Sequence, residues 1–169
     1  ERLHRDGYLF IRELLPKNDI LRVHRRLLEK ASKGGWLDPT TPLEAGIANQ
    51  EAACKDPEES YMRVFPDLWN DEELHRLRSH PQVLDFFDFI FGEPTLVHPS
   101  FVQRNIFPQG PNFDFTTRPH QDKPNIGGGT NYALWAPLGD CPVAKGSLAI
   151  AAGSHKFGVL DIKVSSGAV

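Results

Sequence analysis

The sequence of 169 residues has few cysteines, no long apolar run and no concentrated positive charge. Without about 18 consecutive apolar residues, no segment is predicted to span a membrane. A formal net charge of -3 argues against a nucleic-acid partner, because a polyanion is bound by a concentrated basic surface. Cys54 and Cys141 lie far apart and follow no apolar leader, so we expect free thiols in a reducing compartment. The sequence thus predicts a cytoplasmic protein with a single domain over residues 1–169.

The first part of the chain, residues 1–94, is predicted to be rich in helices. Residues 8–11 form a short apolar strand candidate, and apolar residues at three- and four-residue spacing then predict a helix that ends at Gly34. Acidic residues from Asp71 onwards and the proline at position 81 are typical of two further helix starts.

The segment 36–60 interrupts this helical pattern. It holds several prolines and scattered acids, and it shows no sustained period of 2 or 3.6 residues. Irregular segments of this length are usually functional lids or mobile loops. We interpret it as a lid-like loop, with a plain surface excursion as the alternative of equal weight.

From residue 95 to 169 the pattern changes to short strand-type segments separated by turns rich in Gly, Pro and Asp. The predicted strands are 96–98, 101–107, 118–122, 131–138 and 147–151. Helices followed by strands predict a mainly β protein of the α+β type, in which an antiparallel barrel or sandwich follows the helices.

The chemistry of the sequence is concentrated in the short motif His120-Gln121-Asp122. On an extended backbone the first and third side chains point to the same face. An imidazole and a carboxylate on one face are two of the three ligands of the 2-His-1-carboxylate triad, which holds ferrous iron and leaves other positions open. A second triplet, His4-Arg5-Asp6, has the same spacing, but it lacks the companion motifs of a kinase catalytic loop. We predict that this second triplet is a solvated N-terminal segment.

A series of short motifs, in order and spread over nearly the whole chain, resembles the phytanoyl-CoA dioxygenase family. They are Asp6-Gly7-Tyr8-Leu9-Phe10-Ile11, His80-Pro81-Gln82-Val83-Leu84, Phe91-Gly92-Glu93-Pro94, Pro119-His120-Gln121-Asp122, Leu134-Trp135-Ala136-Pro137-Leu138, Lys145-Gly146-Ser147-Leu148 and Gly153-Ser154-His155-Lys156. The resemblance implies a double-stranded β-helix, a jelly roll of the cupin type, over residues 95–169, with helices packed on one side. It also implies Fe(II), 2-oxoglutarate and molecular oxygen, with ascorbate as a candidate auxiliary reductant.

The implied reaction is hydroxylation of a small organic or acyl-type substrate, with release of succinate and CO2. The resemblance makes His120 and Asp122 the iron ligands and places Trp135 against the 2-oxoglutarate site. Related halogenases replace the carboxylate with a small residue, so the retained Asp122 favours hydroxylation over halogenation.

On the strand before the motif, the resemblance implies a side chain that touches the co-substrate. Gln103 is the best match, and a different register would put Arg104 or Asn105 in its place.

The third iron ligand and the arginine that binds 2-oxoglutarate lie, in the family, beyond the Gly-Ser-His-Lys turn, and neither is found before Val169. We therefore expect the C-terminal strands of the jelly roll to be missing, and a polypeptide that ends here to form no succinate. A truncated chain, an unrepresented C-terminal part and a degenerate member stay open as explanations. So do two other functions, a non-catalytic jelly-roll binding module and a metal-dependent isomerase. His155 is a disfavoured candidate for the third ligand.

Overall fold

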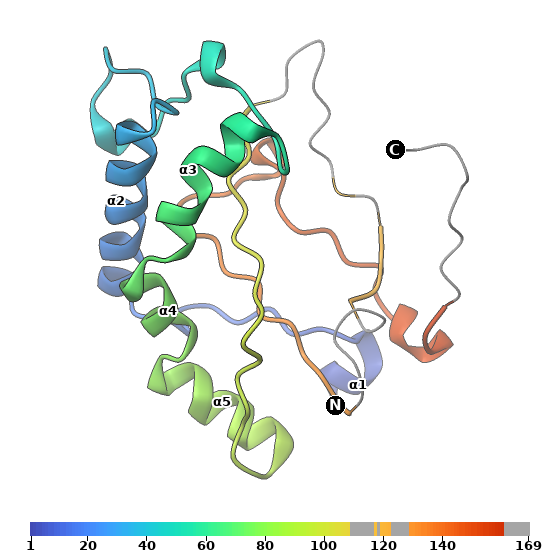
Figure 1. Cartoon of the computed structure of the whole chain (residues 1–169). Helices are drawn as coiled ribbons and strands as arrows, with labels where there is room; N and C mark the ends of the chain where they lie inside the picture. Colours follow the sequence, from blue (N-terminus) through green and yellow to red (C-terminus); the bar gives the residue numbers. More distant parts are fainter. Residues whose placement is uncertain (109–116, 118, 123–128, 161–169) are drawn as a thin grey trace.

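A computed structural model describes residues 1–108, 117, 119–122 and 129–160 of the chain (Figure 1). In these residues a group of helices is followed by extended segments that run beside it. The α-helices are α1 (Arg2–Asp6), α2 (Lys17–Lys33), α3 (Glu59–Trp69), α4 (Glu72–Arg78) and α5 (Pro81–Phe91). The 3-10 helices are η1 (Leu43–Ala45), η2 (Gln50–Ala52), η3 (Val143–Lys145) and η4 (Ser154–Phe157). None of the helices in the described ranges is both long and apolar enough to cross a membrane.

Helix α2 confirms the helix predicted from the apolar spacing. Its buried residues, Val23, Leu27 and Ala31, follow one another at four-residue intervals and so form one stripe along the helix. The helix ends at Gly34, whose backbone N–H donates to the carbonyl of Lys30. A Cβ atom at Gly34 would collide with the side chain of Val64, so glycine lets the end of α2 approach α3 closely.

Helix α3 was missed by the sequence analysis. Its buried residues, Tyr61, Val64 and Leu68, recur at three- and four-residue spacing, which is the signal of a helix with one apolar face. Pro66 lies inside the helix, where its missing N–H and its ring usually oppose helical structure. The buried apolar face outweighs this penalty.

Helices α4 and α5 begin where the sequence predicted. The carboxylate of Asp71 caps α4 by accepting hydrogen bonds from the backbone N–H groups of Glu73 and Leu74. Pro81 is the first residue of α5, and Gly92 ends this helix with a φ of 73°. Val83 is the fully buried residue of α5, and the aromatic residues of this helix are partly buried or exposed.

Aromatic contacts join an extended segment, residues 101–107, to the helical part of the chain. The ring of Trp36 stacks on that of Tyr61 at 5.2 Å, and the ring of Phe107 meets Trp36 edge-on at 5.6 Å. At the other end of the segment the ring of Phe101 stacks on Trp69 at 5.2 Å. The segment is therefore held to the helices at both of its ends.

Arg78 strengthens the attachment at the first end of this segment. Its guanidinium carbon lies 4.0 Å from the centre of the Phe101 ring, and its Nη2 donates to the backbone carbonyl of His98 at 2.7 Å. Burial lowers the pKa of the Arg78 guanidinium. Arg78 thus links α4 to the extended chain without an acidic partner among the described contacts.

The prediction of a mainly β jelly roll is wrong for the described residues. The predicted strands 8–11, 96–98, 101–107, 131–138 and 147–151 are not strands, and part of 118–122 lies outside the described residues. Within the described chain the single isolated bridge joins Leu37 and Ala48 in antiparallel fashion. Burial does alternate along 101–107, so the predicted period of two is present there. The alternation sets which side chains face the core, but a strand also requires a neighbouring backbone that pairs with its N–H and C=O groups.

The segment 36–60 is anchored at two buried residues, Trp36 and Cys54. Two backbone hydrogen bonds of 2.8 Å close its first half, from Asp38 N to Ile47 O and from Asn49 N to Trp36 O. Both cysteines are free, as expected, and burial raises the pKa of the Cys54 thiol. The role of this segment as a lid stays a prediction.

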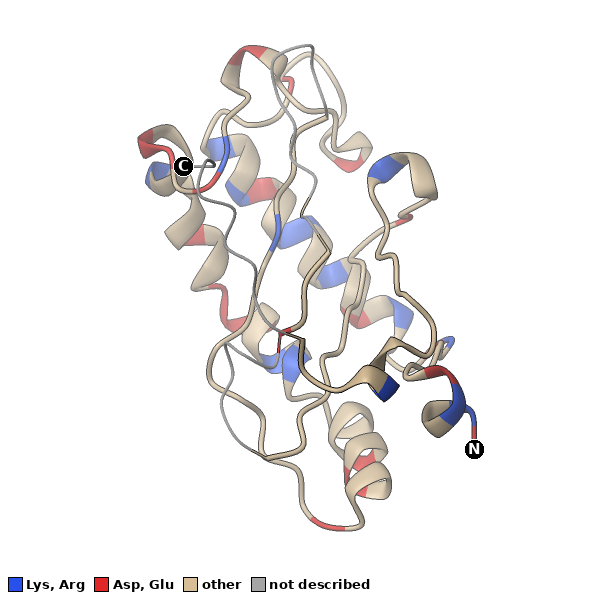
Figure 2. Ribbon diagram, turned by 90° about the vertical axis from the view of Figure 1, so that its right-hand side faces the viewer, with Lys and Arg blue, Asp and Glu red and all other residues tan. Residues whose placement is uncertain are grey.

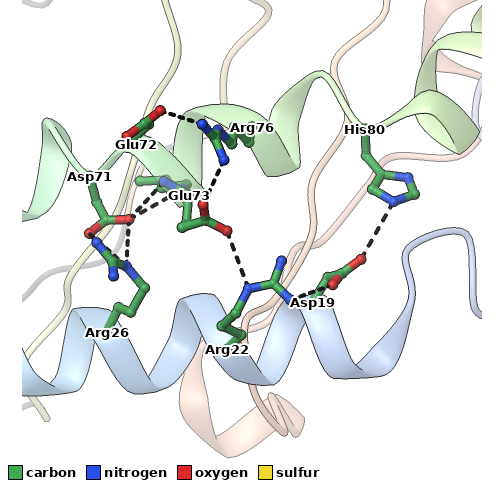
Figure 3. A network of polar contacts seen from close by, with 9 residues as sticks. Asp19, Arg22, Arg26, Asp71, Glu72, Glu73, Arg76 and His80 are labelled. Carbon is green, nitrogen blue, oxygen red and sulfur yellow. Dashed lines mark hydrogen bonds and ion pairs between the residues drawn. The ribbon is translucent and has the colours of Figure 1, made fainter.

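The strongest polar contact in the described chain joins α2 to α4 (Figure 3). The carboxylate of Asp71, whose side chain has 0% exposure, lies 3.0 Å from Arg26 Nη2 and 2.8 Å from Lys30 Nζ. Beside it, Arg22 bonds to both Asp19 and Glu73. Basic residues are spaced along the length of α2 (Figure 2). Their acidic partners lie on α2 itself, on η1 and on α4 with its capping residue Asp71.

The carboxylate of Asp71 is held in its ionised form by these partners. Burial alone would raise its pKa, but hydrogen bonds from Arg26, Lys30 and the Leu74 backbone outweigh burial and lower the pKa from 3.8 to about 2. A lowered folded-state pKa contributes stability that is fully present above about pH 4 and is lost as the pH falls through about 2. The shift corresponds to about 2 kcal/mol.

We predict that Asp71→Asn lowers the free energy of unfolding at pH 7 by about 2 kcal/mol, because Asn keeps the helix cap but leaves two cations without their shared counter-charge. The loss of stability between pH 4 and 2 should also become shallower. Urea unfolding followed by circular dichroism over this pH range measures both effects. Glu72→Gln is the matched control, because Glu72 is an exposed partner of Arg76 on the same helix and its loss should change stability by less than about 0.5 kcal/mol. Equal losses in the two variants would contradict the prediction.

We predict that backbone amides of residues 50–60, apart from that of Glu58, exchange hydrogen quickly without ligand and more slowly when 2-oxoglutarate is added. The amides of Asp38, Asn49 and Glu58 should exchange slowly in both conditions, because each donates a backbone hydrogen bond of 2.7 or 2.8 Å. Hydrogen exchange resolved by residue measures this difference. Fast exchange of 50–60 that no ligand alters would leave only the surface-excursion interpretation.

Candidate functional site

The two residues predicted to bind metal lie together. His120 Nε2 is 3.3 Å from Asp122 Oδ1, and the two side chains are 53% and 55% exposed. Two ligand atoms each about 2.1 Å from one metal ion and at right angles to each other lie about 3 Å apart. The observed separation is therefore suited to a shared ion, and the half-exposed setting leaves room for further ligands.

The residue between them points the other way. Gln121 is partly buried, whereas His120 and Asp122 are exposed. Its side-chain Nε2 donates to the carbonyl of Gly158 at 2.9 Å, and its Oε1 accepts from the backbone N–H of Leu160 at 2.8 Å. This alternation agrees with the period of two from which the shared face was predicted. In Figure 1 the motif lies on the same side of the molecule as η4.

Gln103, the predicted co-substrate residue, faces the helices from the extended segment 101–107. Its Nε2 and Oε1 atoms are both buried and have no hydrogen-bond partner among the described residues. Asn105 lies two residues further on and faces the same way, and its Nδ2 atom is also buried without a hydrogen-bond partner among the described residues. Buried amide atoms are rarely left unpaired, since each costs about 1–3 kcal/mol when unsatisfied. The pair of amides thus has unused capacity to bind a polar group.

Tyr61 lies on the helical side of this amide pair. Burial raises the pKa of its hydroxyl, and a hydrogen bond involving Asn105 opposes that effect. The phenol is therefore neutral and serves as a hydrogen-bonding neighbour, so Asn105 is partly engaged while the amide of Gln103 is not.

Trp135, predicted to line the co-substrate site, has 45% of its surface exposed. It lies in the extended segment 129–138, separate in sequence from both the motif and Gln103. Of the predicted site residues, the structure brings His120 and Asp122 together. Contact of Trp135 and Gln103 with that pair stays a prediction.

His155, the disfavoured third ligand, is engaged with the N-terminal helix. Its Nε2 lies 3.0 Å from the carbonyl oxygen of His4, which can only accept, so this nitrogen donates. No group of three His, Cys, Asp or Glu side chains able to hold a metal is found within the described ranges. Within those ranges, His120 and Asp122 stay the two predicted metal ligands.

Gln121 is the residue of this site that sequence reasoning passed over. It was part of the motif that carried the family resemblance, but it received no role. The period of two predicts that it faces away from the metal ligands. No local signal predicts its partners, which lie 37 and 39 residues further along the chain.

Comparison with known proteins identifies a matching family and two similar hydroxylases. The family model of phytanoyl-CoA dioxygenase matches residues 3–164. The 1-deoxypentalenic acid 11-beta-hydroxylase of Streptomyces arenae is 31% identical over 157 residues, which are 90% of this chain and 52% of that protein. The protein of the same description from Streptomyces exfoliatus is 30% identical, with the same coverage. No solved structure matches the chain.

The chain spans about half the length of these curated relatives. The family model, in contrast, matches the described helices, the His120–Asp122 pair and η4 in one continuous range. On this match, the chain belongs to the phytanoyl-CoA dioxygenase family.

Proposed function

We propose that this chain carries part of the active site of an Fe(II)- and 2-oxoglutarate-dependent oxygenase that hydroxylates a small organic substrate. The observation that carries the proposal is the 3.3 Å approach of His120 Nε2 to Asp122 Oδ1 on one exposed face. Membership of the family and the two hydroxylase relatives support the same reaction class.

The donor set suits ferrous iron. A neutral imidazole and a carboxylate are two of the three protein ligands in the facial triad that leaves positions open for other ligands. Bound iron with 2-oxoglutarate and oxygen supplies the oxidising chemistry, and succinate and CO2 are its by-products. Asp122 occupies the position that halogenases leave to a halide, so hydroxylation is the proposed outcome.

The protein's own residues hold and shield the co-substrate. The amide of Gln103 offers one donor and one acceptor, both without partners in the described chain, to a carboxylate or its bound water. The exposed indole of Trp135 offers an apolar wall that limits access of water. Neither residue exchanges a proton in this role; they position the ligand.

The substrate is proposed to be a small organic acid or acyl compound. The relatives are named as hydroxylases of 1-deoxypentalenic acid, a carboxylic acid. Identity near 30% supports the class of substrate but not the particular acid.

We predict that His120→Ala and Asp122→Ala each weaken binding of Fe(II) by at least about 100-fold, because each removes a direct ligand, and loss of an indirect partner already costs about 10- to 100-fold. Anaerobic calorimetric titration measures the affinity. The same changes should abolish any succinate formation from 2-oxoglutarate.

The second triplet with the same spacing, His4-Arg5-Asp6, supplies matched controls. His4→Ala and Asp6→Ala remove the same side chains at the same spacing, and they should leave Fe(II) affinity unchanged. Asp6 pairs with Arg5 instead, and hydrogen bonding to Arg5 lowers the pKa of its carboxyl. Full Fe(II) affinity in Asp122→Ala would refute the assignment of the metal site.

We predict opposite effects of Gln103→Leu on stability and on ligand binding. The free energy of unfolding should rise by about 1 kcal/mol, because leucine removes two buried amide atoms that lack partners. Affinity for 2-oxoglutarate should fall by about tenfold, since hydrogen bonds to a charged ligand are lost. Thermal unfolding and calorimetric titration measure the two effects.

Gln82→Leu is the control for this substitution, because Gln82 is exposed at the start of α5. It should change neither quantity. A fall in stability of Gln103→Leu would show that the amide has a structural partner, and unchanged co-substrate affinity would remove Gln103 from the proposed site.

A further inference from the structure

The motif that carries the two metal ligands has no strand pairing in the described structure, yet it is fixed at its centre. The side-chain amide of Gln121 donates to Gly158 O at 2.9 Å and accepts from Leu160 N at 2.8 Å. The donor and acceptor ends of the amide are each matched to a backbone group of the complementary kind, which sets the orientation of the amide. We call this pair of bonds the Gln121 clamp.

The geometry of the clamp imitates a β-ladder. In a parallel sheet, one residue accepts from and donates to backbone groups that lie two residues apart on its neighbour. Gly158 and Leu160 are related in this way. The side chain of Gln121 thus provides the hydrogen bonds that a neighbouring backbone would otherwise provide.

The backbone just before Gly158 is tied to the N-terminal part of the chain. The backbone N–H of Gly153 donates to Asp6 O at 2.7 Å, and His155 Nε2 donates to His4 O at 3.0 Å. Gly7, with a φ of 81°, lies directly under the His155 ring, where a Cβ atom would collide with it. The backbone that receives the clamp is therefore itself anchored, through η4 and α1.

We propose that Gln121 is a positioning residue that holds His120 and Asp122 in the arrangement needed for a metal ion, and that η4 and α1 form the support on which it acts. This inference depends on the proposed metal site. Both ligand side chains are half-exposed and extend from backbone that is neither helix nor strand in the described chain, and the Gln121 clamp fixes the residue between them. A motif ordered before binding loses less conformational freedom when the ion arrives, and the clamp supplies that order.

The test uses Gln121→Met, which keeps the length of the side chain and removes both hydrogen bonds. Co(II) serves as the probe, because its absorption spectrum reports both affinity and ligand geometry. We expect affinity for Co(II) to fall about tenfold, as for other residues that orient metal ligands, with an altered spectrum. Exchange of the Leu160 amide hydrogen should accelerate, because its acceptor is gone. Gln82→Met, the same change at an exposed position on α5, should alter none of these quantities.

A second variant alters the backbone that accepts the hydrogen bond from Gln121. Gly158 has φ 72° and ψ -160°, a combination that side chains oppose, and an added Cβ would meet no atom within 4 Å. Gly158→Ala should therefore turn the carbonyl away from Gln121 without a steric clash. We expect it to reproduce the loss of Co(II) affinity, although the metal motif itself is unaltered. Circular dichroism and the melting temperature identify any variant that fails to fold.

The outcomes separate this inference from the proposed function. If the unaltered protein binds Co(II), and both folded variants bind it equally well, the positioning role is overturned while the metal site stands. If the unaltered protein binds no Co(II), the metal site fails and the positioning role fails with it. Weaker binding in both variants, with faster exchange at Leu160 in Gln121→Met, supports the inference.

Discussion

The buried carboxylate of Asp71 is the contact on which the described structure depends. It caps α4 through two backbone N–H groups, and it receives Arg26 and Lys30 from α2. Lys30 also donates to the carbonyl of Asp67 near the end of α3, at 2.7 Å. The carboxylate thus joins α2 to α4, and Lys30 extends the link to α3. Its burial is favourable only because every oxygen has a charged or N–H partner, and loss of any partner would leave charge in an apolar setting.

The helices fixed in this way present an aromatic surface to the rest of the chain. The ring of Trp36 contacts Phe107, and the ring of Trp69 contacts Phe101. The two phenylalanines lie at the two ends of one extended segment. The segment between these contacts is held in place whether or not its inner side chains have partners. This explains how Gln103 and Asn105 can face inward with unpaired amide atoms. Apolar anchors on either side offset the cost of buried amide atoms that have no partner among the described residues.

Sequence reasoning succeeded where the deciding signals are local. Caps, prolines and apolar spacing located α2, α4 and α5, and the period of two brought His120 and Asp122 to one face. It missed α3, because Pro66 masked an apolar stripe that is otherwise clear. It predicted strands because alternation indicates extended backbone. Pairing, however, depends on a distant partner that no local pattern identifies. The hydrogen-bond partners of Gln121 were not predicted for the same reason, because they lie far along the chain.

The contact between α1 and η4 joins residues 151 positions apart, as His155 does with His4. Closing so long a loop costs chain entropy before any contact repays it, so such contacts form late in folding. Contacts within the helices, in contrast, are local and form early. During synthesis, the N-terminal helix must then wait until η4 has left the ribosome before the two can meet. On the proposed role of Gln121, the motif from His120 to Asp122 depends on that meeting and is among the last described parts of the chain to become ordered. Premature capture of a metal ion by the nascent chain would thereby be disfavoured.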